Sequence, residues 1–236
     1  MLGMPEPTAY DLRFRFLGIP VRVHPLFWLF TALLAGQNAT LDSVLIWIGC
    51  VFVSILVHEY GHALMSRVFR LSPSIVLYSM GGLCYSEVER QTPWQRLAVL
   101  FAGPGAGLLL FVCVWGGYRA LGEPQLSSVG WQIYRNLIDI NLYWSILNLF
   151  PIWPLDGGQI TGVVLTMINR RKGMNWAHVI SLVTAGLLAV WMFQKEIMFL
   201  GIFFALFALI NFQVLQAQHH AAKYGPLEDD ADWWKR

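Results

Sequence analysis

The residues best suited to chemistry are His58, Glu59 and His62, which form H-E-x-x-H inside the apolar run SVLIWIGCVFVSILVHEYGHALMSRVF. Because an α-helix turns once every 3.6 residues, the two histidines stack on one face and can converge on one metal ion. Glu59 lies about 100° round the same helix, where it can reach a water molecule as a general base. Ionisable groups in an apolar helix are functional by default. The pattern therefore predicts a catalytic metal centre rather than a helix with satisfied core histidines.

A catalytic zinc usually has three protein ligands and an open fourth position, so a third ligand must come from elsewhere in the chain. The candidates are His24, Glu123, Asp139, Asp156, His178 and Glu196. We favour Asp156, because it lies in the helix-breaking sequence NLFPIWPLDGG, where a carboxylate at membrane depth is hard to keep without a cation. Asp139 stays open as the alternative ligand. Asp156 can also cap the helix that follows, and one residue can do both.

The hydrophobic composition indicates that membrane helices hold these residues. The chain has 236 residues, of which 56% are hydrophobic and 13% charged, and its mean hydropathy is +0.53. This leaves too little polar surface to coat a soluble globule, so we expect an all-α polytopic membrane protein. Runs long enough to cross a bilayer predict about six spans, at residues 25–41, 43–66, 97–118, 133–169, 176–193 and 197–215.

Two interruptions are expected within this helical plan. The fourth span is broken at residues 148–158, where prolines and glycines interrupt backbone hydrogen bonding and the chain must line a protected cavity. Residues 74–89 contain two short β-prone stretches around Gly81 and Gly82, which predicts a membrane-associated β-hairpin. The organisation expected is a cytoplasmic segment at residues 1–24, a membrane domain at residues 25–215 and a cytoplasmic tail at residues 216–236.

Charge sets the expected orientation and the class of partner. Thirteen of the sixteen basic residues fall on one side of the six-span plan, and only Arg119, Arg135 and Lys195 fall on the other. Since cytoplasmic loops accumulate Lys and Arg, both termini should be cytoplasmic. The residues before the first span do not resemble a signal peptide, which fits a prokaryotic inner membrane. A net charge of +2 provides no basic surface for nucleic acid, so the bilayer is the expected partner.

These motifs resemble those of the site-2 protease family of intramembrane zinc metalloproteases over roughly residues 20–170. The H-E-x-x-H of the family corresponds to His58, Glu59 and His62, and its later Asn, Pro and Asp-Gly motif corresponds to Asn148, Pro151 and Asp156-Gly157. The family's Gly-Gly hairpin corresponds to Gly81 and Gly82. Where relatives often have Gly-Pro-x-x-Asn, this chain has Gly103-Pro104 and then Gly107, so the resemblance supports the set of metal ligands but not the polar contact of that Asn near the site.

The resemblance implies an activity and a role for each of these residues. His58, His62 and Asp156 would bind Zn²⁺, Glu59 would be the catalytic glutamate, and Asn148 would help hold the substrate together with Gly81 and Gly82. The substrate would be a membrane-anchored protein, often a regulatory one, cut within or near its transmembrane segment. Two alternatives stay open: a membrane zinc-binding or transport protein, and a catalytically inactive relative that binds membrane segments.

Overall fold

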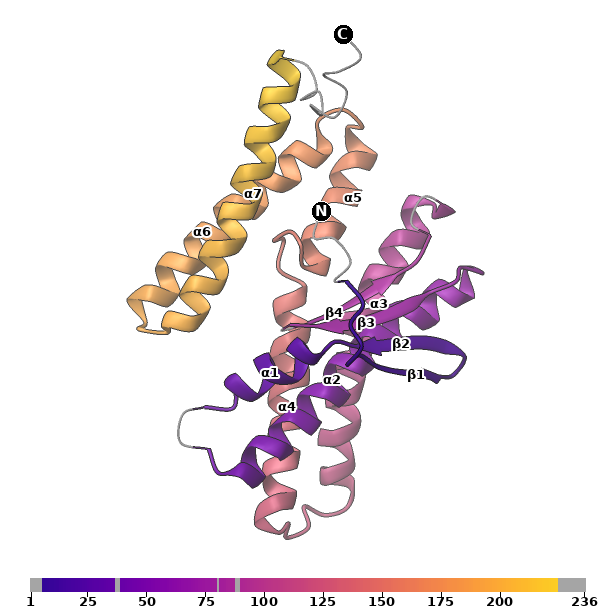
Figure 1. Ribbon diagram of the computed structural model, residues 1–236, viewed down its shortest axis with the longest axis vertical. Coiled ribbons are helices and arrows are strands. Elements are labelled where there is room, and N and C mark those ends of the chain that lie inside the picture. Colours follow the sequence, from indigo (N-terminus) through magenta and orange to yellow (C-terminus); the bar gives the residue numbers. More distant parts are fainter. Residues whose placement is uncertain (1–5, 37–38, 80, 88–89, 225–236) are drawn as a thin grey trace. The chain divides into compact units, whose positions relative to one another are not determined.

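The computed structural model describes residues 6–36, 39–79, 81–87 and 90–224, which form seven helices and four strands (Figure 1). The chain divides into two compact units, Met1–Leu149 and Phe150–Arg236. The first unit contains β1 (Leu12–Phe16), β2 (Ile19–Val23), α1 (Pro25–Leu33), α2 (Leu41–Val68), β3 (Ser74–Tyr78), β4 (Gly81–Tyr85), α3 (Pro93–Ala120) and α4 (Ser128–Asn148). The second contains α5 (Asp156–Ile168), α6 (Gly173–Gln194) and α7 (Met198–Tyr224).

The four strands form one sheet in the order β1-β2-β3-β4, beside α2 (Figure 1). β1 and β2 form an antiparallel hairpin, as do β3 and β4, and the two hairpins join through the parallel pair β2 and β3. Apolar side chains alternate along β2 and face α2, which buries Val21, Val23, Ile75 and Leu77 in one core with Ile55 of α2. The sheet is therefore anchored to the helix that carries H-E-x-x-H.

The predicted hairpin is present, but its turn is not where the glycine pair suggested. Tyr78 pairs with Gly81 and Leu77 with Gly82, so both glycines lie inside β4 and the turn begins at Ser79. Ser79 has φ of 50°, the left-handed conformation that a tight turn requires. The end of the predicted hairpin, residues 88 and 89, lies outside the described residues.

Among the described residues, four helices are long and apolar enough to cross a membrane: α2, α3, α6 and residues 198–220 of α7. Only 17–33% of the most apolar window in each helix is buried inside the protein, so most of its apolar side chains face outward. A soluble protein would hide such faces in its core, whereas lipid accommodates them. The chain is an integral membrane protein, although the predicted count of six spans is not confirmed by these four helices.

The structure adds to or differs from the predicted plan at both ends of the described chain. In place of a first span at residues 25–41, α1 has nine residues and is only about 14 Å long. The segment at residues 1–24 contains both strands of the first hairpin. At the other end α7 continues to Tyr224, past the predicted boundary at residue 215, and residues 225–236 lie outside the described part of the chain.

Candidate metal centre

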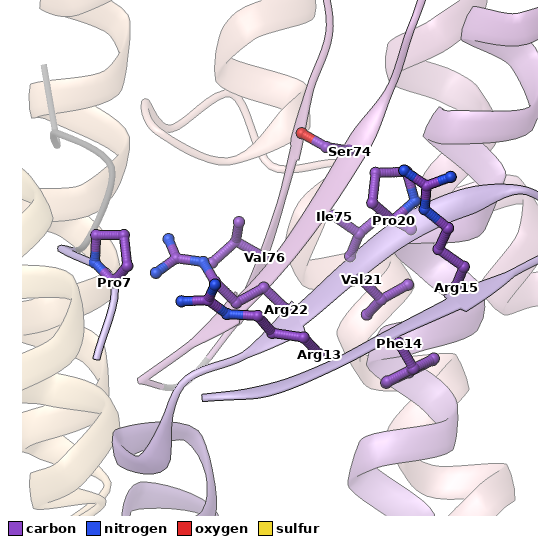
Figure 2. Close-up of a pocket in the computed structure, with 10 residues that line it drawn as sticks. All are labelled: Pro7, Arg13, Phe14, Arg15, Pro20, Val21, Arg22, Ser74, Ile75 and Val76. Carbon is purple, nitrogen blue, oxygen red and sulfur yellow. The ribbon is translucent and has the colours of Figure 1, made fainter. Parts of the chain in front are cut away.

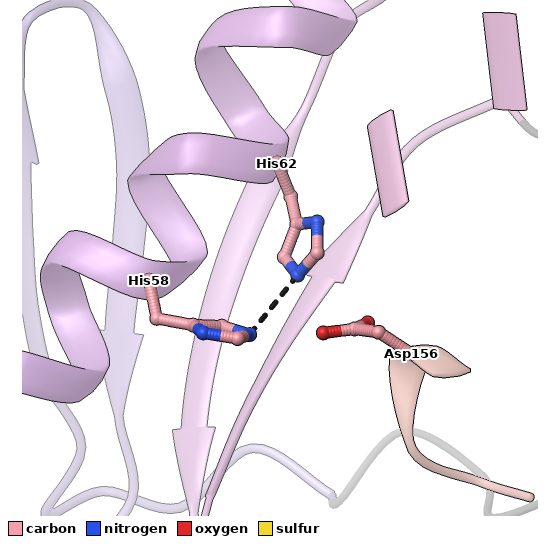
Figure 3. Close-up of side chains that lie close together, drawn as sticks. All are labelled: His58, His62 and Asp156. Atoms are coloured by element: carbon pink, nitrogen blue, oxygen red, sulfur yellow. Dashed lines mark hydrogen bonds between the residues drawn. The ribbon is translucent and has the colours of Figure 1, made fainter. Parts of the chain in front are cut away.

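His58, Glu59 and His62 lie in the C-terminal half of α2, and all three side chains are buried. The Nε2 atoms of His58 and His62 are 3.2 Å apart (Figure 3). Two Zn–N bonds of about 2.0–2.1 Å at a tetrahedral angle would place their nitrogens about 3.3 Å apart. The two imidazoles therefore have the separation that zinc ligands need.

α3 orients the ring of His62. Its Nδ1 lies 2.7 Å from the carbonyl oxygen of Val99. Because a carbonyl oxygen only accepts hydrogen bonds, Nδ1 must be the donor, and in the neutral imidazole the lone pair is then on Nε2. Gly103 makes room for the ring, since a Cβ there would lie 2.1 Å from His62 Nε2. The Val99 contact thus leaves the lone pair of Nε2 available for a metal ion, and Gly103 leaves room for the ring.

α2 and α3 approach closely at this level because both have glycine there. A Cβ on Gly61 would lie 2.2 Å from the carbonyl oxygen of Ala102. Pro104 lies inside α3 and has no N–H, so it cannot donate the usual helical hydrogen bond to the carbonyl oxygen four residues earlier, which is next to Val99 in the chain. In the sequence Gly103-Pro104 is recognisable only as a family motif, and the structure shows that Gly103 faces the ring of His62.

β4 lies against Glu59. A Cβ on Gly82 would come within 2.3 Å of Glu59 Cγ and 2.5 Å of Oε1, so only glycine leaves room for this side chain. A Cβ on Gly81 would meet only the ring of Trp144, at an ordinary 3.9 Å. The resemblance predicts the same substrate-binding role for both glycines, but only Gly82 is packed against Glu59.

Asp156 belongs to the second unit, where it is the first residue of α5 (Figure 3 draws its carboxylate). Its side chain is buried. Leu155 occupies the N-cap position and makes no side-chain cap, so Asp156 is not the N-cap but stands in the first turn, where the helix dipole favours a negative charge. Asp139, the alternative third ligand, is exposed on α4.

The remaining predicted residues lie on α3 and α4. Asn148 is the last residue of α4, is buried, and donates from Nδ2 to the carbonyl oxygen of Trp144, 2.9 Å away. Gly107 faces α4, where a Cβ on it would lie 2.3 Å from the buried Ser145 Oγ. The hydroxyl of Ser145 thus occupies the space next to Gly107 that the Cβ of the family's Asn would need.

A cavity of about 480 Å³ lies on the sheet, lined by residues of β1, β2 and β3 and by Pro7 (Figure 2). Arg13, Arg15 and Arg22 are among the residues that line it. Arg22 donates to Asp11, 3.1 Å away. The cavity contains no residue of H-E-x-x-H, so it is separate from the candidate metal centre.

Comparisons with known proteins point to one family. The model of Peptidase family M50 matches residues 46–130 and 123–193. A Synechocystis protein with the name of a zinc metalloprotease is 35% identical over 66% of this chain and 45% of its own length. Stage IV sporulation protein FB of Bacillus subtilis is 27% identical over 71% of this chain and 54% of its own length. The chain thus spans about half the length of the curated relatives it matches.

A solved structure shares the fold. The site-2 protease from Methanocaldococcus jannaschii matches with a TM-score of 0.64 at 21% sequence identity, covering 87% of this chain and 95% of that one. The matched family segments together span residues 46–193, which is more than half of the chain and includes both H-E-x-x-H and the Asp-Gly motif. The chain therefore belongs to Peptidase family M50, the family of the site-2 proteases that its motifs resemble.

Proposed function

We propose that this protein is an intramembrane zinc metalloprotease, which hydrolyses a peptide bond within or near the transmembrane segment of a membrane-anchored protein. The observation that carries the proposal is the buried H-E-x-x-H of α2, whose two Nε2 atoms are 3.2 Å apart. Membership of Peptidase family M50 and relatives named as zinc metalloproteases support it.

The proposed zinc ligands are His58, His62 and Asp156, each of which is buried and offers one ligand atom. Two imidazoles and one carboxylate are a donor set that catalytic zinc favours, and they leave a fourth position open. Zinc in such a site supplies a Lewis acid, which lowers the pKa of water and polarises a carbonyl group. Val99 and Gly103 contribute by fixing the ring of His62.

Glu59 is the proposed general base and acid. Its carboxylate would remove a proton from the attacking water and pass it to the leaving amine nitrogen, so hydrolysis needs no covalent intermediate. Gly82 determines where that carboxylate lies, because a larger residue on β4 would displace it.

The proposed substrate contacts are Asn148, Gly81 and Gly82. β4 is an edge strand of the sheet, so an unwound substrate segment can add to it by backbone hydrogen bonds. Asn148 has its Nδ2 engaged by α4, which leaves Oδ1 as the atom suited to accept a substrate N–H.

We also propose six membrane crossings, of which the first is made by β2 and α1 together. Trp47 of α2 donates to the carbonyl oxygen of Thr31, and Tyr60, thirteen residues further along α2, donates to that of Phe16. The chain from Phe16 to Thr31 therefore runs beside α2 over about 20 Å. The non-helical residues 149–155 between α4 and α5 support an interruption of the fourth crossing.

An even number of crossings places both termini on one side, and the thirteen-to-three distribution of basic residues supports the cytoplasm as that side. A prokaryotic inner membrane is the proposed location, since relatives that match this chain come from bacteria and an archaeon.

The test of the metal centre is the zinc content of the detergent-purified protein, measured for wild type, Asp156→Ala and Asp139→Ala. About one zinc per chain is expected in wild type and in Asp139→Ala, with a large loss in Asp156→Ala. Zinc retained by Asp156→Ala and lost by Asp139→Ala would move the third ligand to α4. A wild type that stays empty after zinc is added would argue for an inactive, metal-free relative.

The test of the activity uses Glu59→Gln and a membrane-anchored substrate in reconstituted vesicles. The variant should keep its zinc and lose cleavage, because it keeps the size of the side chain but not the base. Chelation should abolish wild-type cleavage, and added zinc should restore it. Zinc passage across the vesicle membrane that His58→Ala blocks, without cleavage of the substrate, would instead identify a transporter.

A further inference from the structure

The non-helical residues before Asp156 are held by polar side chains from α6 and α7. The N–H of Trp153 donates to Ser181 Oγ on α6, at 3.0 Å, and the carbonyl oxygen of Trp153 accepts from Asn211 Nδ2 on α7, at 2.8 Å. The backbone N–H and the backbone carbonyl of Trp153 are therefore both bound by side chains rather than by other backbone groups. Ser181 and Asn211 are fully buried.

Asn211 is held in one orientation by its own contacts. Its Nδ2 also donates to the carbonyl oxygen of Phe207 at 2.8 Å, and its Oδ1 lies 2.8 Å from Nδ1 of the buried His178. Since carbonyl oxygens only accept, the amide cannot be turned round, and His178 must donate from Nδ1. Ser181 in turn donates to the carbonyl oxygen of Ala177 at 2.8 Å. Three buried side chains thus form one network around one residue of the backbone.

The network is close in the chain to Asp156. Leu155 N donates to the carbonyl oxygen of Ile152, and Gln159 Nε2 donates to that of Pro154. The first turn of α5 packs directly on the same segment, since a Cβ on Gly158 would lie 2.3 Å from the carbonyl carbon of Ile152. A shift of Trp153 would therefore carry the start of α5 with it.

We propose that His178, Ser181 and Asn211 are positioning residues, which hold the Trp153 peptide groups and thereby fix the carboxylate of Asp156 for the metal. The proposal rests on the proposed function of Asp156 as a zinc ligand. Residues 149–155 have no helical ladder, and backbone polar groups away from water need partners. α6 and α7, which carry no catalytic motif, supply those partners and so act on the metal site through the backbone.

The test compares Asn211→Leu and Ser181→Ala with Gln213→Leu, which removes an exposed amide two residues further along α7. Zinc affinity of the full-length protein in detergent is measured by competition with a chromophoric chelator. The dissociation constant should rise about tenfold or more in Asn211→Leu and Ser181→Ala, in the range seen when groups that orient ligands are removed, and stay unchanged in Gln213→Leu. Unchanged affinity in both network variants would overturn the proposal.

Hydrogen–deuterium exchange of the zinc-free protein separates this proposal from the proposed function. Exchange across residues 150–158 should rise in the two network variants and not in Gln213→Leu. If wild type binds no zinc, the proposed function fails, and exchange alone decides whether the network holds the segment. If Asn211→Leu does not fold, the smaller change Ser181→Ala decides.

A conservative pair distinguishes positioning from general stability. His178→Asn can still donate to Asn211 Oδ1, whereas His178→Phe keeps a ring but has no donor. Zinc affinity should be close to that of wild type in His178→Asn and weakened in His178→Phe. Equal affinity of the two variants would contradict a role for the hydrogen bond.

Discussion

Three glycines shape the proposed metal centre, because the absence of a Cβ at each leaves space that a neighbouring side chain or helix occupies. Gly103 gives room to the ring of His62, Gly82 gives room to Glu59, and Gly61 lets α2 and α3 meet. A residue that contributes no atom to a site can still decide where the reactive atoms lie. The H-E-x-x-H spacing indicated the pair of histidines, but no spacing along the chain could show which residues of α3 and β4 face them.

Gly82→Ala tests this view at a single position. The new Cβ would overlap Glu59 Cγ, so the carboxylate must move, and a displacement of about 1 Å can reduce a reaction rate about a hundredfold. Cleavage by the reconstituted variant is the measurement, with zinc content expected to be unchanged. Gly49→Ala, on α2, is the matched control, because its Cβ would meet no described atom within 4 Å and activity should be retained. Equal activity of the two variants would rule out a steric role for Gly82.

Gly107→Asn tests the departure from the family pattern. Restoring the family residue should destabilise this chain, since its Cβ would overlap Ser145 Oγ, and overpacking of a core typically costs about 1–3 kcal/mol. Combining it with Ser145→Gly should recover much of that loss by removing the hydroxyl. Thermal unfolding in detergent measures both variants. A single variant as stable as wild type would show that α3 and α4 can separate without penalty.

At the scale of elements, the second hairpin could be predicted from its composition, but the first could not be placed. The sequence LRFRF has the strict alternation of a strand, but the plan expected from the sequence describes residues 1–24 only as a cytoplasmic segment. The parallel pairing of β2 with β3 joins residues more than fifty positions apart, which no local pattern encodes. The same limit applies to α1, since its length depends on packing against α2 and not on the length of an apolar run.

The start of the first hairpin should respond to acid. Burial alone would raise the pKa of Asp11, but hydrogen bonds from Thr8 and the guanidinium of Arg22 outweigh it and lower this pKa to about 2. An ordinary Asp has a pKa of about 3.9, so the stabilisation from the charged form is complete above about pH 4 and is lost as the pH falls through about 2.

Hydrogen–deuterium exchange of the peptide that covers residues 8–23 can detect this loss of stability. At pH 5 the wild-type peptide should exchange more slowly than that of Asp11→Asn, and the difference should disappear as the pH approaches 2. Thr40→Ala, which removes the N-cap of α2 far along the chain, is a control that should not change this peptide. A difference that persists undiminished at pH 2 would contradict the assignment.

For the whole molecule, apolar composition and the two motifs were enough to predict a membrane protein and the family to which the chain belongs. The number of crossings was less accessible, because an apolar run does not show how much of it is helical: within residues 25–41 the helix is the nine-residue α1. The polar network of α6 and α7 was also inaccessible, since His178, Ser181 and Asn211 are distant in sequence from Trp153 and lie in runs that resemble ordinary apolar spans.

The proposed topology predicts which surfaces a membrane-impermeant reagent can reach. In a variant without native cysteines, Gln125→Cys, between α3 and α4, should be labelled from the outside of intact cells. Arg171→Cys, between α5 and α6, should be labelled only after the cells are opened. Both positions are exposed in the structure. Labelling of both from the same side would contradict the six-crossing arrangement.

The parallel pairing of β2 and β3 also affects how the protein is made. Val21 pairs with Ile75, so the ribosome must finish α1 and α2 before β2 has its second partner. During synthesis the first hairpin therefore has an open edge, while α2 is already entering the bilayer. The end of α2 with the proposed metal ligands cannot be enclosed until translation has passed β4. A nascent chain that stalls before residue 85 would have H-E-x-x-H without the strand that confines Glu59.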